Sequence, residues 1–419
     1  MPPRIVIVTA SVGEGHDLPA RTLAAQLRAE RPDVEIETID GLAPMGRAIV
    51  AISEGAPRVV FFRFGWLWDI GFWVFAVFAP TRRLTQAALT RVGGRGLLCL
   101  VEAHRPDVVV STYPHTTEVL GRLRISGRLR VPLCAAVTDL AALRYWATPG
   151  ADVHLVTHSE SIEELRRIAG RSARAHCVNG LTDPAFCAPR GKNDARTALG
   201  LPVDGKIVLV SGGGWGVGKI DIAVEVALEL AEVGLVVCLC GRNERLRHRL
   251  ERAYGDPARV RIEGFTEQMP DWLAAADALV HSTGGLTILE SIIRGCPAIS
   301  FGWGRGHIRP NDAAYRRFGL AQVAESRAEL KSALARALEK GGSPDLAYAR
   351  LASAASIVLA QARDRARAGE EPAGDRHERE RAGNDGSVEG RAAPVLAADD
   401  RGKDDGNSDL HRQDGGTDA

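Results

Sequence analysis

The sequence lacks an excess of charge of either sign. Its 419 residues contain 53 lysines and arginines against 52 aspartates and glutamates, so the formal net charge is only +1 at pH 7. A protein that attracts nucleic acid through its overall field needs a strongly basic balance. The composition therefore predicts no nucleic-acid partner, and any anionic ligand has to be recognised by a local group of residues.

The sequence also lacks the spacings typical of zinc sites and disulfide frameworks. It contains no Cys-x-x-Cys pair and no histidine cluster, and we interpret its seven cysteines as small buried residues in a reducing compartment. The N-terminal Met-Pro-Pro-Arg leads directly into the apolar run 5–8, without the charged and apolar regions of a signal peptide. These features predict a cytoplasmic protein.

Apolar runs typical of strands alternate with helical patterns along most of the chain. A first group of runs lies at 4–9, 34–39, 107–111, 132–138 and 153–157, and a second group lies at 206–210, 235–240, 259–262, 278–281 and 297–301. This alternation predicts an α/β protein with parallel sheets. We expect two Rossmann-like domains facing a cleft, residues 1–187 and 194–363, joined by a polar hinge at 188–193.

The C-terminal part of the chain has two distinct patterns. Helices are predicted near 326–340 and 344–362, where they close the second domain and can reach back to the first. From Asp364 onward there is no Phe, Trp or Tyr, and Gly, Asp, Glu and Arg are frequent. Such a segment cannot bury enough apolar surface to offset the entropy lost on ordering. We therefore predict a disordered tail over 364–419.

Two glycine-rich loops in the second domain each follow a predicted strand and precede a predicted helix. The first is Ser-Gly-Gly-Gly-Trp-Gly-Val-Gly-Lys at 211–219, and the second is His-Ser-Thr-Gly-Gly-Leu-Thr-Ile-Leu-Glu at 281–290. Glycines allow positive φ angles and close approach to a ligand, while free amides and the helix dipole favour an anion. Together the loops predict a phosphate-containing ligand, although a plain tight turn is the alternative for the first loop alone.

The second loop also carries polar side chains suited to a nucleotide. Thr283 and Thr287 can donate hydroxyl hydrogen bonds near the helix start, and Gly284 and Gly285 leave room for a diphosphate. Glu290 can accept hydrogen bonds from ribose hydroxyls, or it can be an acid in the first turn of the helix that complements the helix dipole.

An aromatic segment at 59–79 holds nine of the 17 Phe and Trp residues. Its length approaches a membrane span, but Arg63 and Asp69 lie inside it, which makes spanning costly. We expect a helix or helical hairpin at a membrane interface, with Trp66, Trp68 and Trp73 at the acyl boundary. The alternative is that these aromatics fill the core of the first domain or a dimer interface.

Three motifs together resemble a known enzyme family. They are Thr9-Ala-Ser-Val-Gly-Glu-Gly-His16, the glycines at 212–218 and Ser282-Thr-Gly-Gly-Leu-Thr-Ile-Leu-Glu290. Over residues 1–345 the chain resembles GT-B glycosyltransferases of the monogalactosyldiacylglycerol synthase and processive diacylglycerol glycosyltransferase type, related to the murein-precursor N-acetylglucosaminyltransferases. The resemblance implies that His16 is the catalytic base and that Gly13 and Gly15 lie on the acceptor side.

The resemblance also implies a UDP-sugar donor site in the second domain. Thr287 is then expected near the diphosphate, Glu290 on the uridine ribose and Asn311 in the segment after the last strand. The loop amides and Arg242 would stabilise the leaving diphosphate. The complete predicted donor set is Gly212, Gly213, Gly214, Gly216, Arg242, Thr283, Gly284, Gly285, Thr287, Glu290 and Asn311.

The chemistry of sugar transfer needs a base for the acceptor hydroxyl, and imidazole titrates near neutral pH. His16 is the first candidate, with a loop or N-cap histidine as the alternative. Asp139 at the end of a predicted strand can orient His16, bind the acceptor or cap a helix, and His115 is a weaker candidate on the acceptor side. No Asp-x-Asp occurs in the predicted folded region, so we expect neither a metal nor another cofactor, and the resemblance implies inversion.

The sequence thus predicts an enzyme that transfers a hexose from a UDP-sugar to a lipid such as diacylglycerol. Its partners would be the nucleotide sugar, the lipid acceptor and the inner face of the cell membrane, where it would be peripheral. Alternatives are a UDP-N-acetylglucosamine 2-epimerase of the same fold, a transferase for another apolar acceptor such as a carotenoid, and a non-catalytic nucleotide-sugar-binding protein. The aromatic segment disfavours the epimerase.

Overall fold

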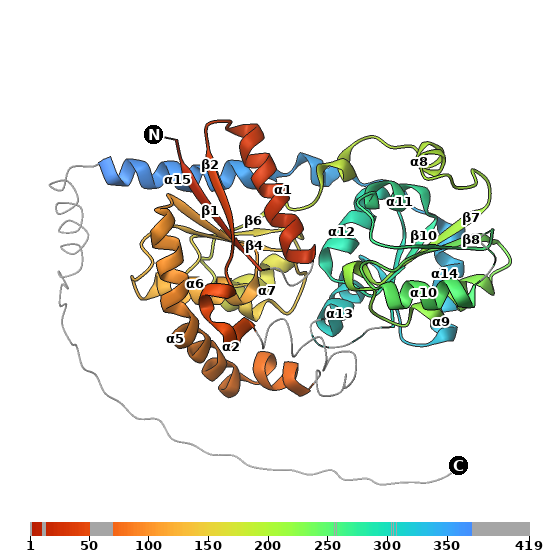
Figure 1. Cartoon of the computed structure of the whole chain (residues 1–419), viewed down its shortest axis with the longest axis horizontal. Coiled ribbons are helices and arrows are strands. Elements are labelled where there is room, and N and C mark those ends of the chain that lie inside the picture. The colour runs from red at the N-terminus through yellow and green to blue at the C-terminus, as the bar shows by residue number, and fades with distance from the viewer. Residues whose placement is uncertain are drawn as a thin grey trace, which may run out of the picture. The chain divides into compact units, whose positions relative to one another are not determined.

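A computed structural model describes residues 2–10, 14–50, 70–254, 256, 258–302, 304, 306 and 308–370. These residues form two parallel β-sheets with helices packed on their faces (Figure 1). The strand order is β13-β6-β5-β4-β3-β1-β2 in the first sheet and β12-β11-β10-β7-β8-β9 in the second. The predicted α/β class with two parallel-sheet domains is confirmed.

The strands of the first sheet are β1 (Arg4–Thr9), β2 (Glu35–Asp40), β3 (Val108–Ser111), β4 (Leu133–Val137), β5 (Val153–Val156), β6 (Ala175–Asn179) and β13 (Ala352–Ser353). Those of the second are β7 (Lys206–Ser211), β8 (Val233–Leu239), β9 (Val260–Glu263), β10 (Ala278–His281), β11 (Ala298–Phe301) and β12 (Gln322–Ala324). The helices are α1 (Glu14–Glu30), α2 (Arg47–Val50), α5 (Ala79–His104), α6 (Pro114–Ile125), α7 (Ser161–Ala169), α8 (Lys192–Ala198), α9 (Ile220–Leu228), α10 (Glu244–Ala253), α11 (Met269–Ala275), α12 (Gly285–Arg294), α13 (Ile308–Phe318), α14 (Arg327–Lys340) and α15 (Ala354–Glu370).

The strand order of each sheet reverses at one point. In the first sheet the reversal lies between β1 and β3, and in the second it lies between β7 and β10. Open parallel sheets bind ligands beyond the carboxyl ends of the strands at such a point. His16 and His115 lie in the first turns of α1 and α6, the helices that follow β1 and β3, and the two glycine loops follow β7 and β10. Both sets of predicted site residues therefore lie where this architecture places ligands.

Both faces of each sheet are buried, as continuous apolar strands predict. In β1, Ile5 and Ile7 belong to a core that includes residues of α1 and α15. Val6 and Val8 belong to a second core on the other face, with residues of α5 and α6. This alternation fixes the register, because a shift by one residue would exchange the two faces.

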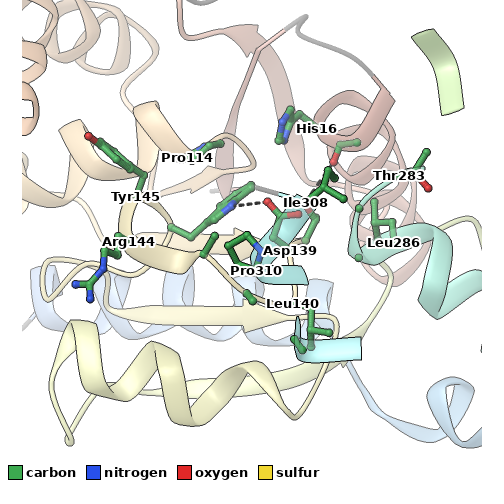
Figure 2. Close-up of a pocket in the computed structure, with 18 of the residues that line it drawn as sticks. His16, Pro114, Asp139, Leu140, Arg144, Tyr145, Thr283, Leu286, Ile308 and Pro310 are labelled. Atoms are coloured by element: carbon green, nitrogen blue, oxygen red, sulfur yellow. Dashed lines mark hydrogen bonds between the residues drawn. The ribbon is translucent and has the colours of Figure 1, made fainter. Parts of the chain in front are cut away.

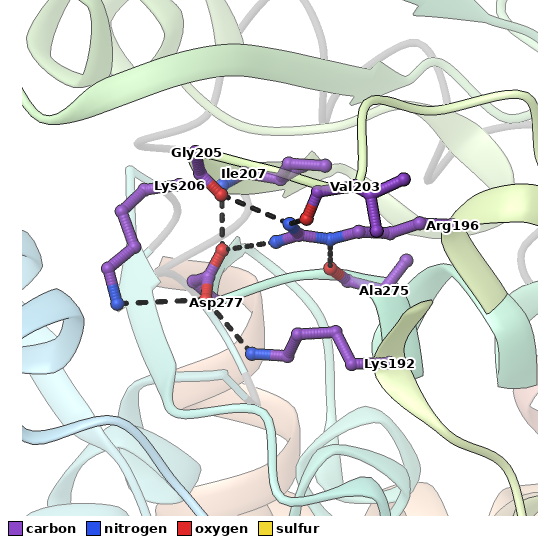
Figure 3. Close-up of polar contacts among 8 residues, drawn as sticks. All are labelled: Lys192, Arg196, Val203, Gly205, Lys206, Ile207, Ala275 and Asp277. Atoms are coloured by element: carbon purple, nitrogen blue, oxygen red, sulfur yellow. Dashed lines mark hydrogen bonds and ion pairs between the residues drawn. The ribbon is translucent and has the colours of Figure 1, made fainter. Parts of the chain in front are cut away.

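A buried ionic network holds the start of β7 beside the start of β10 (Figure 3). The Asp277 carboxylate accepts hydrogen bonds from Arg196 at 2.7 Å, from Lys192 at 2.9 Å and from the backbone N–H of Ile207 at 2.8 Å. Arg196 is 3% exposed and also donates to three backbone carbonyls, those of Val203, Gly205 and Ala275. The charges are therefore paired and hydrogen-bonded, which buried charges require.

The predicted strands agree with the structure to within two residues at each end, but β6, β12 and β13 were not predicted. β12 and β13 have only three and two residues, and β6 is largely half-exposed, so none of them produces an apolar run. The helix predicted near 344–362 is confirmed only from Ala354 onward, where α15 begins. That segment contains a 3-10 turn at Leu346–Arg350, the strand β13 and the first half of α15.

Residues 352–362 were predicted to close the second domain and to be able to reach back to the first, and they pack on the first sheet. β13 pairs with β6, and the apolar side chains of α15 join the core around Ile5 and Ile7 (Figure 1). A helical stripe shows that one face is buried but not which sheet buries it. Residues 364–370 continue α15, so the predicted tail starts too early there. Its remainder, 371–419, lies outside the described residues, as do residues 59–69 of the aromatic segment.

Candidate functional site

One cavity of about 1320 Å³ is lined by residues that follow strands of both sheets (Figure 2). From the first domain it includes four predicted residues, namely Gly15, His16, His115 and Asp139, together with Tyr113 and Thr138, which were not predicted. From the second it includes eight predicted donor residues, namely Gly212, Gly213, Gly214, Thr283, Gly284, Gly285, Thr287 and Glu290. The fold thus brings most of the predicted site residues to one cavity.

The first glycine loop makes a tight turn that only glycine accommodates. Gly213, Gly216 and Gly218 have φ angles of 64°, 58° and 101°. A Cβ on Gly216 would lie 2.4 Å from the carbonyl oxygen of Cys240. Gly216 is therefore required by the packing of the turn, and it does not line the cavity as Gly212, Gly213 and Gly214 do.

The second glycine loop places the N-terminus of α12 at the cavity. Gly284 is the N-cap residue and offers no side-chain cap, so the first amides of α12 are left for a ligand. The loop lies close to the first domain, because a Cβ on Gly285 would be 2.9 Å from the carbonyl oxygen of Thr138. His158 Nε2 lies 3.0 Å from the Gly285 carbonyl oxygen, to which it donates. This arrangement fits an anion held by backbone groups.

Glu290 lies in the second turn of α12, so the alternative of a first-turn acid that complements the dipole is wrong. Its side chain is buried, and Oε1 accepts a hydrogen bond of 2.7 Å from the hydroxyl of Thr182. Burial raises the pKa of Glu290 to about 7, although the Thr182 hydrogen bond opposes this shift. The carboxyl is therefore partly ionised at neutral pH. Its ionised form accepts hydrogen bonds from hydroxyl groups.

His16 lies in the first turn of α1, where it is not the N-cap residue. Its Nδ1 lies 3.1 Å from the carbonyl oxygen of Thr112. A carbonyl only accepts, so Nδ1 carries the proton and the Nε2 of the neutral ring carries the lone pair. The ring is packed against Tyr113, at 4.9 Å between centroids, and Trp146, at 5.7 Å. This tautomer is the one that a general base acting through Nε2 requires.

The other two candidates on the acceptor side have different surroundings. Asp139 Oδ2 accepts a hydrogen bond of 3.1 Å from the indole N–H of Trp146, which is the dashed line at Asp139 in Figure 2. Nδ1 of His16 is oriented instead by the backbone carbonyl of Thr112. His115 is held between the rings of Tyr113 and Tyr145. Burial, with a smaller effect of charge on His16, lowers the pKa of His115 to about 4, so His115 is neutral at physiological pH.

Three further predicted residues do not line the cavity. Arg242 lies over the ring of Phe265, with 3.7 Å from its guanidinium carbon to the ring centroid. Asn311 is fully buried, and its Oδ1 accepts a hydrogen bond of 3.0 Å from the backbone N–H of Ala141 in the first domain. Trp73 is 55% exposed and stacks on Phe78. Gly13, Trp66 and Trp68 lie outside the described residues.

Apolar side chains form one wall of the cavity next to His115. They come from α2, from α5 and from the π-helix Trp73–Val77 with the residues before it, and they are Ile49, Phe72, Phe75, Val77 and Leu89. The hydroxyl of Tyr145 donates to the carbonyl oxygen of Phe75 at 2.6 Å and so ties the wall to the site. Tyr145, Trp146 and Thr182 were not predicted as site residues, because nothing in the linear sequence places them beside the candidates.

Two solved structures have folds similar to the fold of this chain. MurG from Acinetobacter baumannii aligns with 85% of this chain and 99% of its own, with a TM-score of 0.50 and 14% identity. A putative UDP-N-acetylglucosamine 2-epimerase from Listeria monocytogenes aligns with 81% of this chain and 88% of its own, with a TM-score of 0.51 and 13% identity. The predicted GT-B fold is confirmed.

Comparisons with known sequences show which enzymes this chain resembles. Residues 16–180 match the family model described as monogalactosyldiacylglycerol (MGDG) synthase. The processive diacylglycerol beta-glucosyltransferase of Staphylococcus aureus (strain MRSA252) is 23% identical over 325 residues, which are 77% of this chain and 81% of that protein. The Staphylococcus epidermidis enzyme of the same name is 26% identical over 232 residues, where the chain spans 59% of the relative's length. The predicted resemblance and enzyme class are confirmed, and the chain is a glycosyltransferase of the GT-B fold.

Proposed function

We propose that this enzyme transfers a hexose from a UDP-sugar to the free hydroxyl of diacylglycerol. The observation that carries the proposal is the cavity in which two glycine loops, His16 and an apolar wall meet. The glycine loops and the N-terminus of α12 suit a diphosphate. The apolar wall suits acyl chains. The curated relatives act on diacylglycerol, as their names state.

In the proposed reaction His16 is the general base. Nε2 accepts the proton of the acceptor hydroxyl while that oxygen forms a bond to C1 of the sugar, and the bond from C1 to the diphosphate breaks. Attack from the face opposite the leaving group inverts C1. The negative charge of UDP is stabilised by the amides of Gly284 and Gly285 and by the dipole of α12. The proton stays on His16 until the product leaves.

The reaction is proposed to need no metal ion, since backbone amides and the helix dipole neutralise the leaving group. Glu290 is assigned to the ribose hydroxyls, and Thr287 to the diphosphate. Activity in the presence of EDTA is the direct test. Loss of activity with EDTA and recovery with a divalent cation would contradict this part of the proposal.

The enzyme is proposed to act as a peripheral protein on the inner face of the cell membrane. Within the residues that the structure describes, none of the helices is both long and apolar enough to cross a bilayer. Six large apolar side chains in or near the cavity wall are 43–69% exposed, namely Ile70, Trp73, Phe75, Val77, Phe78 and Leu84. Exposed side chains of this kind suit a lipid surface. Their exposure supports this proposal over a place in the core of the first domain, and a dimer interface is an outcome of the test.

The test is release of UDP by the purified protein. UDP-glucose, UDP-galactose, UDP-glucuronate and UDP-N-acetylglucosamine are each supplied with vesicles that contain or lack diacylglycerol. Release that depends on diacylglycerol supports the proposal and identifies the sugar. Release that depends on another apolar acceptor contradicts the choice of lipid, and conversion of a UDP-sugar to its epimer without release favours the epimerase. Vesicle sedimentation of Trp73→Ser beside wild type tests the membrane contact.

A further inference from the structure

Trp146 contacts both predicted catalytic side chains although it was not itself a predicted site residue. Its indole N–H donates to Asp139 Oδ2 at 3.1 Å, and its ring lies 5.7 Å from that of His16. The side chain is only 2% exposed and is among the largest buried ones. A buried indole N–H needs a hydrogen-bond partner, and here that partner is the carboxylate of Asp139, which lines the cavity.

The backbone around Trp146 is held firmly. The residue follows the 3-10 turn Leu143–Tyr145, and its own N–H donates to the carbonyl oxygen of Leu143. The N–H of Leu143 donates in turn to Glu164 on α7 at 3.1 Å. Ala142 before the turn has a left-handed φ of 64°, a conformation that non-glycine residues adopt when the surrounding structure enforces it. The direction of the indole is therefore fixed by its turn.

The carboxylate of Asp139 lies between the two domains of the site. A Cβ on Gly284 would lie 3.2 Å from Asp139 Oδ1, so this oxygen faces the donor glycine loop. The other oxygen, Oδ2, is the one that accepts the indole N–H. Indole is a donor only, and it holds one oxygen in place without competing for protons. One carboxylate oxygen is thus fixed, and the other is directed toward the cavity.

We propose that Trp146 is a positioning residue. It holds Asp139 Oδ2 in place, so that Oδ1 accepts a hydrogen bond from a hydroxyl of the acceptor or of the donor sugar during transfer. This inference rests on the proposed function and deepens it. Without the indole N–H, the carboxylate can rotate about two side-chain torsions, and the reacting groups lose part of their alignment. Alignment of this kind contributes to the rate more than to ground-state binding.

The first test compares Trp146→Phe with Trp272→Phe. Phenylalanine keeps an aromatic ring and removes the N–H donor. Trp272 is a matched control, because it is 3% exposed, donates its own indole N–H to Thr266 at 3.1 Å and does not line the cavity. We expect Trp146→Phe to lower kcat about 10- to 100-fold and to change KM for the UDP-sugar less than about threefold, whereas Trp272→Phe stays within about twofold of wild type. Equal losses in both variants, or wild-type kcat in Trp146→Phe, would overturn the proposal.

A double-mutant cycle shows whether Trp146 acts through Asp139. Asp139→Ala is expected to lower kcat at least as much as Trp146→Phe, and the double variant should be no slower than Asp139→Ala alone. Multiplied losses in the double variant would mean that Trp146 acts by another route. Turnover by wild type in the same assay tests the proposed function separately.

A second measurement does not depend on turnover. The seven tryptophans give seven indole N–H signals in protein labelled with ¹⁵N-tryptophan, and the signal of Trp146 is the one lost in Trp146→Phe. We expect that N–H to exchange slowly with solvent in wild type and faster in Asp139→Ala, while the Trp272 signal is unchanged. Equal exchange of the Trp146 N–H in wild type and Asp139→Ala would overturn the contact, even if no sugar transfer were found.

Discussion

Replacing Glu290 with glutamine should stabilise the protein against unfolding at neutral pH while weakening its binding of the donor nucleotide. The pKa of the Glu290 carboxyl is raised from 4.5 to about 7 because burial removes its hydration, and the hydrogen bond from the hydroxyl of Thr182 offsets only part of that loss. The native state therefore keeps this proton between about pH 4.5 and pH 7, while the unfolded state releases it. The unfolded state binds fewer protons, so the free energy of unfolding falls as pH rises through that window.

The size of the effect follows from the shift. One pKa unit corresponds to about 1.4 kcal/mol, so a rise from 4.5 to about 7 predicts a loss of about 3 kcal/mol between pH 4.5 and pH 7.5. Glutamine cannot ionise and keeps a carbonyl oxygen for Thr182. We expect Glu290→Gln to match wild type at pH 4.5 and to exceed it by up to about 3 kcal/mol at pH 7.5.

The assay is urea unfolding at half-unit intervals from pH 4.5 to pH 8, followed by far-UV circular dichroism and by tryptophan fluorescence. Glu339→Gln, on the exposed face of α14, is the control that removes a carboxyl without removing a buried one. Folded wild type and folded Glu290→Gln are also titrated with UDP over the same pH range. Ribose hydroxyls donate to the ionised carboxylate, so the Kd of wild type should fall as pH rises through 7 and the Kd of Glu290→Gln should not. A variant with the same pH slope of stability as wild type would refute the reasoning about burial.

Three further changes test other parts of the structure. His16→Ala should lower kcat about 100-fold or more while UDP binding measured by calorimetry is unchanged, and near-normal turnover would remove His16 as the base. Asp277→Asn should lower the free energy of unfolding by about 3 kcal/mol, because it leaves the guanidinium of Arg196 buried without its partner. Burial opposes ionisation of Asp277, but hydrogen bonds from Ile207 and Lys192 outweigh it and hold the pKa of Asp277 below the usual 3.8. The stabilisation that comes from the ionised carboxylate should therefore be lost from wild type when urea unfolding is repeated below about pH 4. Asp277→Asn should show no such loss. Tyr145→Phe removes the hydroxyl that donates to Phe75 and should raise KM for vesicle diacylglycerol several-fold without changing KM for the UDP-sugar; equal changes in both would show a general loss of structure.

Local patterns in the sequence determined much of the site. Residues that follow a parallel strand lie at one edge of its sheet, so the positions of His16 after β1 and of the glycine loops after β7 and β10 were enough to assign them to a ligand-binding edge. Positive φ at Gly213 and Gly218 follows from the tight turn that their spacing predicts. Apolar runs, glycine spacing and chain order are properties of residues that are neighbours in the sequence, so they can be identified without the tertiary structure.

The tertiary structure decided which side chains meet across long stretches of chain. Thr182 and Glu290 are 108 positions apart, and the Thr112 carbonyl that orients His16 is 96 positions from it. Even Trp146 and Asp139, seven positions apart, meet only because a left-handed residue and a 3-10 turn bring the indole back to the carboxylate. The return of α15 to the first sheet has the same cause: burial of an apolar stripe is encoded locally, but the surface that buries it is chosen by the packing of the whole chain.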